Sequence, residues 1–184
     1  MSINQQQFVW PTSFACTIIT EKIILPNLYS INVGIEPNHN GPNNISLGFK
    51  KLRHFIDYQL NNSVFINQEH PLVKSLGDTE TNVVLLPCDP YDYFVGGILY
   101  SKFLSITEKY FDIDLITIDS TVGDHVQYCL GHPEECGLDL KGDYWWNMDS
   151  TDTGQNKNTN WEDLDLHDMP RFEPKIIKGG KSEN

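Results

Sequence analysis

The feature that most constrains this fold is a change of hydrophobic period between the ends of the chain and its middle. Residues 14–20, 22–25 and 28–35 are rich in β-branched side chains and are separated by short polar turns, which predicts three strands. Residues 113–118 and 126–130 flank a Ser-Thr-Val-Gly-Asp turn and predict a hairpin. Strands at both ends favour a mostly antiparallel sheet over a doubly wound parallel one.

Between these ends, apolar residues recur at helical spacing. One helix is predicted over about 45–61 and a second, longer one over about 90–111. Asp89 suits the N-cap of the second helix, and the Gly96-Gly97 pair predicts close approach of another element. Residues 64–66 and 83–86 read as short strands, the latter buried on both faces. The prediction is therefore a single α+β domain with a mostly antiparallel sheet and two main helices.

The character of the chain changes after residue 140. We predict a globular domain over 1–140 and an acidic tail over 141–184 that is at least partly flexible, because its hydrophobicity is low. This tail nevertheless contains Trp145, Trp146 and Trp161. In one interpretation these tryptophans, with Leu164 and Asp165, bind a partner protein, since Trp is enriched at interface hot spots. In the other they fold back and cover part of the domain's core.

The charge of the chain bears on its partners. The 25 acidic and 13 basic residues give a net charge of −12, so a phosphate backbone repels the protein and direct nucleic-acid binding is disfavoured. The same field favours a protein partner with a basic surface, and a nucleic-acid enzyme with a basic cleft is the first class to search. The alternative is that acidity only keeps the protein in solution.

The sequence predicts a cytoplasmic location. The first eight residues lack the basic and apolar regions of a signal peptide, and no run of about 20 apolar residues predicts a membrane span. Four cysteines in a chain of this length do not indicate a disulfide framework.

One group of residues has the chemistry of a zinc site. His125, Cys129, His132 and Cys136 supply four ligands of the types that zinc prefers, although their even spacing departs from the usual pair of compact ligand pairs. In the alternative, Cys129 is a small buried residue and His132 belongs to a turn. We expect no cofactor, with zinc as the alternative.

Three further groups have a functional and a purely structural interpretation. Acid–base catalysis or Mg²⁺ binding is one interpretation of Asp89 and Asp92, with His125 near them. In the other interpretation the two carboxylates only cap a helix. Cys88, beside that helix start, is expected to have a lowered pKa. Cationic and titratable side chains on the polar face of the first helix would bind a phosphate or an acidic partner, or are simply solvated: Lys50, Lys51, Arg53 and His54.

The segment from Val84 to Phe103, with the sequence VLLPCDPYDYFVGGILYSKF, resembles a stretch of small, uncharacterised proteins of tailed bacteriophages. The resemblance implies an accessory or host-directed role and no activity, and no phosphate loop, nucleophile elbow or zinc-protease motif occurs in the chain. The leading hypothesis is a non-catalytic acidic protein that binds and modulates another protein. The alternatives are a small metal-dependent enzyme or zinc-stabilised domain using residues 125–136, and a structural component of a larger assembly.

Overall fold

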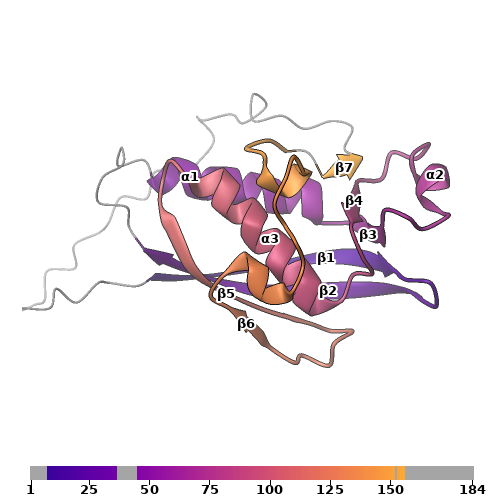
Figure 1. Ribbon diagram of the computed structural model, residues 1–184, viewed down its shortest axis with the longest axis horizontal. Helices are drawn as coiled ribbons and strands as arrows, with labels where there is room; N and C mark the ends of the chain where they lie inside the picture. Colours follow the sequence, from indigo (N-terminus) through magenta and orange to yellow (C-terminus); the bar gives the residue numbers. More distant parts are fainter. Residues whose placement is uncertain (1–7, 37–44, 152, 156–184) are drawn as a thin grey trace, which may run out of the picture.

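The computed structural model describes residues 8–36, 45–151 and 153–155, with the two long helices against one side of a sheet (Figure 1). The strands are β1 (Phe8–Ile19), β2 (Ile24–Glu36), β3 (Ser63–Asn67), β4 (Val83–Leu86), β5 (Asp112–Ser120), β6 (Tyr128–Leu130) and β7 (Gly154–Gln155). The helices are α1 (Ile45–Phe55), continued by the π-helical turn η1 (Ile56–Leu60), then α2 (Val73–Leu76) and α3 (Asp92–Thr107). Two short 3₁₀ turns follow, η2 (Pro133–Cys136) and η3 (Trp145–Asn147).

The described strands form one sheet in the order β6-β5-β2-β1-β3-β4-β7. The pairs β1–β2, β2–β5, β5–β6 and β4–β7 are antiparallel, whereas β1–β3 and β3–β4 are parallel. The predicted fold class, a single α+β domain with a mostly antiparallel sheet and two main helices, is confirmed.

Several element boundaries differ from the prediction. Residues 24–25 and 28–35 were expected in separate strands but belong to the single strand β2, and residues 22–23 lie in the turn before it. Within β2 the buried Asn27 accepts hydrogen bonds from Thr121 Oγ1 (2.8 Å) and Val122 N (3.0 Å). These partners lie more than 90 positions away along the chain, so the local sequence around Asn27 predicts a turn between two strands. The one-turn helix α2 was not predicted.

The second long helix is shorter than expected. Its N-cap is Tyr91, whose side chain makes no capping bond, so the prediction of Asp89 at this position is wrong. The helix ends at Thr107 rather than near 111, and Phe111 turns into the core. The start is displaced because Pro90 is buried and its carbonyl oxygen accepts a hydrogen bond from the Tyr29 hydroxyl (3.3 Å).

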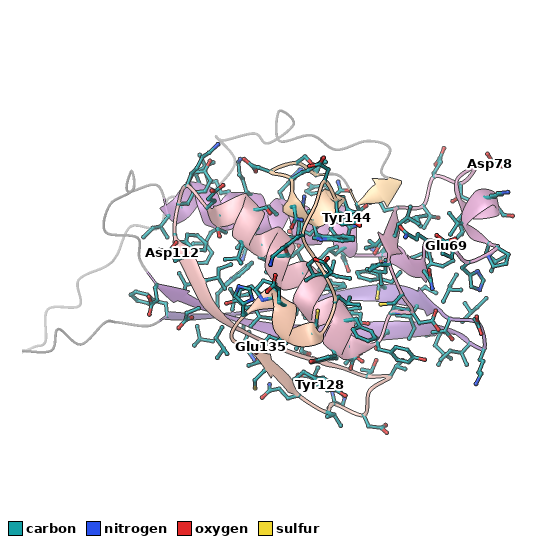
Figure 2. All side chains as sticks on the ribbon, viewed as in Figure 1. Glu69, Asp78, Asp112, Tyr128, Glu135 and Tyr144 are labelled. Atoms are coloured by element: carbon teal, nitrogen blue, oxygen red, sulfur yellow. The ribbon has the colours of Figure 1, made fainter. Side chains whose placement is uncertain are left out.

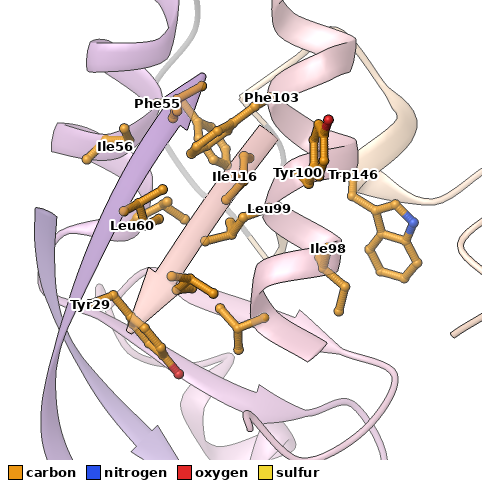
Figure 3. Close-up of a cluster of buried hydrophobic side chains, with 14 of the residues drawn as sticks. Tyr29, Phe55, Ile56, Leu60, Ile98, Leu99, Tyr100, Phe103, Ile116 and Trp146 are labelled. Carbon is orange, nitrogen blue, oxygen red and sulfur yellow. The ribbon is translucent and has the colours of Figure 1, made fainter. Parts of the chain in front are cut away.

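The main core lies between the sheet and the helices α1 and α3 (Figure 3). Alternate residues of the strands, such as Phe14, Tyr29 and Ile116, point into it, as the period of two requires. Figure 3 shows Phe55 and Leu60 meeting Phe103 and Leu99 of α3 in this layer. A second, smaller cluster, formed by Ile19, Ile66 and Val83 with Val73 and Leu76, lies on the opposite side of the sheet beneath α2.

The prediction that the glycine pair allows close approach is confirmed. A Cβ on Gly96 would lie 2.7 Å from Ile118 Cγ2, and one on Gly97 would lie 2.3 Å from Cys136 Sγ. The glycines therefore let α3 pack directly on β5 and on η2.

The segment after residue 140 packs on the domain as far as the structure describes it. Trp145 and Trp146 are 7% and 3% exposed, and their indole Nε1 atoms donate to the carbonyl oxygens of Leu85 (2.8 Å) and Leu140 (3.0 Å). The fully buried Lys102 of α3 donates to the carbonyl oxygens of Trp145 (2.8 Å) and Met148 (2.6 Å). The fold therefore continues past residue 140, up to β7 against β4.

Candidate functional site

The sheet presents one broad surface that the helices do not cover. We call it the open face: the side chains of β1, β2, β5 and β6 that point away from α1 and α3. Strand register and burial define its members as Val9, Pro11, Ser13, Ala15 and Thr17 of β1, Ile24, Pro26, Leu28, Ser30 and Asn32 of β2, Leu115, Thr117 and Asp119 of β5, and Cys129 of β6. An antiparallel sheet with one solvated face normally carries polar and charged side chains there.

The part of the open face contributed by β1 and β2 carries no charge. Val9, Ile24 and Leu28 are 63%, 61% and 41% exposed, and the side chains between them are small or uncharged. In a chain with 21% charged residues and a net charge of −12, a charge-free surface of this length is unusual. Depletion of charge distinguishes the centre of protein interfaces from the rest of a surface.

No motif in the sequence identifies this surface, although the charge pattern of the first two strands gives a signal. Among the first 35 residues only Glu21 and Lys22 are charged, and both lie in the turn between β1 and β2. A half-buried strand would be expected to alternate apolar with charged or polar residues, so the absence of charge from β1 and from β2 as far as Ile35 predicts cover on both faces.

The β5–β6 side of the open face carries polar chemistry. His125 Nδ1 lies 3.1 Å from Asp119 Oδ1, and Ser30 is the cross-strand neighbour of Asp119. Asn32 Nδ2 donates to Thr117 Oγ1 (3.0 Å). The His125 side chain is 65% exposed, so its pair with Asp119 is a solvated contact of small energetic value.

The structure does not bring the four predicted zinc ligands together. Exposed Cys129 points outward on β6, beside Thr117, whereas Cys136 is buried against Gly97 on the helix side of the sheet. His132 is the N-cap of η2, where its Nδ1 accepts from Glu134 N (3.2 Å). In the part of the chain that the structure describes, no three His, Cys, Asp or Glu side chains are grouped so that they could hold a metal ion.

Asp92, one of the two candidate acid–base residues, contacts Ser120 rather than Asp89. Ser120 Oγ lies 2.9 and 2.8 Å from the two carboxylate oxygens, and it accepts from Gly123 N (3.0 Å). Burial raises the pKa of Asp92, while the Ser120 hydrogen bond lowers it and the charge of Asp119 raises it. Because Ser120 is fully buried, its hydroxyl is not available to a substrate. The group stabilises the start of α3 against the end of β5.

The expected activation of Cys88 is wrong. Burial, followed by the neighbouring Cys136 and Asp89, raises the pKa of Cys88 to about 11. The helix dipole cannot lower it as predicted, because α3 begins at Asp92, a full turn later along the chain.

The expected cationic face of the first helix is not a single surface. His54 is buried and its ring lies tilted against Tyr58, with ring centroids 4.7 Å apart. Lys51 forms an ion pair with Asp149 at 3.3 Å and is only 14% exposed, which leaves Arg53 as the exposed member and Lys50 partly exposed. These four side chains do not converge on one ligand.

The predicted partner-binding residues divide into two groups. Trp145 and Trp146 follow the second interpretation, since both cover the core and are not exposed to a partner in this structure. Tyr144, labelled in Figure 2, stacks on Trp146 with ring centroids 4.5 Å apart. Trp161, Leu164 and Asp165 lie outside the described residues.

A search of the described helices finds none with the length and apolar character needed to cross a bilayer.

Two solved structures are similar to this chain in backbone arrangement. Both are 6-pyruvoyltetrahydropterin synthase from Plasmodium vivax, one of them a mutant of a catalytic residue. The identity is 11% with a TM-score of 0.44 for the mutant, and 10% with a TM-score of 0.42 for the other. The alignments cover 68% of this chain and 96% or 97% of the synthase, and similarity at this level assigns no activity. No protein-family model and no curated protein matches the chain.

Proposed function

We propose that this is a non-catalytic interaction protein that binds another protein through the open face of its sheet. The observation that carries the proposal is the charge-free surface of β1 and β2, on which Val9, Ile24 and Leu28 are exposed. Covering these side chains would contribute about 25 cal/mol for each Å² of apolar area removed from water.

The rest of the molecule supports binding rather than chemistry. The residues expected to form a metal site are dispersed, Cys88 is not activated, and Ser120 is fully buried beside Asp92. The net charge of −12 would favour a foreign partner that carries a basic surface. An accessory or host-directed role, implied by the resemblance of residues 84–103, belongs to the same proposal.

The proposal is tested by capture of partners on the full-length protein, using a nuclease-treated host lysate and mass spectrometry. Leu28→Asp places a charge on the open face, and Met148→Asp on the helix side of the sheet is the matched control, because Leu28 and Met148 are 41% and 42% exposed. We expect a partner that wild type and Met148→Asp retain and that Leu28→Asp loses. Equal capture by both variants would show that the open face is not the interface.

A further inference from the structure

We propose that the open face binds a second copy of this chain, so that two sheets pack face to face through β1 and β2. This inference rests on the proposed function, because it names the partner of the same surface. It makes the protein a self-assembling component rather than one that requires a foreign partner.

Charge favours a second copy as the occupant. Two chains that each carry −12 repel one another over most of their surfaces, and the charge-free part of the open face is where this repulsion is weakest. A basic partner would instead be drawn to the carboxylates elsewhere, since β1 and β2 offer its cations no outward acid from Val9 to Thr17 or from Ile24 to Asn32. The surface fits a partner that is itself uncharged there, and an identical copy meets this condition.

The size of the open face also suits a stable pair. At about 3.4 Å per residue and about 4.8 Å between strands, β1 and β2, with 12 and 13 residues, cover on the order of 400 Å² of the open face. The shorter β5 and β6 bring the total to on the order of 600 Å², the lower end of the ~600–1,000 Å² that each partner of a standard interface buries.

The residue types allow two such sheets to pack closely. Ala15 and Leu28 are directly paired between β1 and β2, with Ser13 and Ser30 as the next pair on this face. Small side chains beside Leu28 leave space for the corresponding leucine of the other copy, at the ~10 Å separation of packed sheets. An isologous contact of this kind closes on itself as a dimer.

The experiment is sedimentation equilibrium on purified full-length protein, at about 1 to 100 μM. We expect a species of twice the 21.1 kDa chain mass, and a dissociation constant raised at least ~100-fold by Leu28→Asp, since both copies then bury an unpaired charge. Met148→Asp should leave the constant unchanged. Ala15→Asp provides a second open-face variant, and circular dichroism checks that each variant is folded.

Two results would overturn the inference. A wild-type protein that is monomeric throughout this range has no self-interface, and the capture experiment then decides separately whether the open face binds a foreign protein. An oligomer that both Leu28→Asp and Ala15→Asp leave intact uses another surface, which also removes this face as the site of self-association.

The effect of salt on the affinity distinguishes a second copy of the chain from a basic foreign protein. Raising the ionic strength from about 0.05 to 0.5 M shortens the Debye length and screens the repulsion between two copies, so self-association should strengthen several-fold. A complex with a basic partner would weaken under the same change. Self-association that weakens with salt contradicts packing through a charge-free surface.

Discussion

The two faces of the β1–β2 pair come from the same strands but meet different surroundings. Phe14, on the covered face, is 2% exposed beneath the helices, whereas its neighbours Ser13 and Ala15 point outward and are exposed. The covered face is closed by this chain's own α1 and α3, and the open face has no covering element among the described residues. Packing among the described residues leaves the charge-free open face uncovered, which is the basis for proposing that this face binds another molecule.

The largest test of this comparison is truncation of one apolar side chain on each side. Phe103→Ala removes a fully buried ring that meets Phe55 edge-on and should lower the free energy of unfolding by about 3–5 kcal/mol. Leu28→Ala on the open face should cost less than about 0.5 kcal/mol in the monomer. Urea denaturation followed by circular dichroism, at a concentration where the protein is monomeric, measures both. Similar losses would mean that Leu28 is covered within the monomer.

The second test concerns the close packing of α3 on β5, at Gly96, and on η2, at Gly97. Gly97→Ala would bring a Cβ within 2.6 Å of Cys136 Cβ and 2.8 Å of the Pro133 carbonyl oxygen, so η2 must shift, at about 1–3 kcal/mol of stability. Both substitutions gain about 1 kcal/mol of helix propensity. Gly96→Ala meets the methyl groups of Ile118 and Leu130 and no backbone atom, so its net cost should be smaller. Thermal unfolding of the two variants shows which one loses more stability. A larger loss for Gly96→Ala than for Gly97→Ala would contradict the packing of η2 on Gly97.

The sequence predicted the covered side of the molecule better than the open side. The period of α1 and the unbroken run of β4 are local patterns, so both were found. The long β2 was split because Asn27 finds its partners on residues 121–122, and Trp145 was left between two interpretations because its contacts lie on Leu85 and Phe55. Such partners are set by tertiary packing, which spacing along the chain does not reveal.

The predicted zinc site failed for a related reason. His125 and Cys129 both lie towards the open side of β5 and β6. Cys136, at the end of η2, instead packs against Gly97 on the helix side of the sheet. A motif of residue types gives no information about which side of the sheet each ligand reaches.

A smaller effect tests whether residues after 140 are part of the domain. Trp145→Phe keeps an aromatic ring against Phe55 but loses the indole donor to the Leu85 carbonyl oxygen, which should lower stability by about 1 kcal/mol. Tyr144→Phe is the control, because this ring is 45% exposed and should change stability little. Urea unfolding measures both, and an unchanged Trp145→Phe variant would mean that the segment is not docked in solution.

The smallest expected effect is on how the free energy of unfolding depends on pH, through Asp92 at the start of α3. Burial raises its pKa in the folded protein above 3.8, so the native state binds the proton more tightly than the unfolded chain does. The stability that protonation of Asp92 contributes is fully present below pH 3.8 and is lost as pH rises through the raised native pKa of this carboxyl. Asp92→Asn, which keeps an oxygen that can accept from Ser120, should therefore gain stability relative to wild type between pH 4 and 7.

Ser120→Ala sharpens this test because it removes the hydrogen bond that opposes the shift in Asp92. The variant should be less stable at every pH, since Gly123 N also loses its acceptor, and its stability should fall more steeply with rising pH than that of wild type. Urea unfolding at pH 4, 5, 6 and 7 measures how steeply stability changes with pH in wild type, Asp92→Asn and Ser120→Ala. If Asp92→Asn and wild type change in parallel, the carboxylate is as well solvated as an open-face residue, and the buried contact with Ser120 does not form in solution.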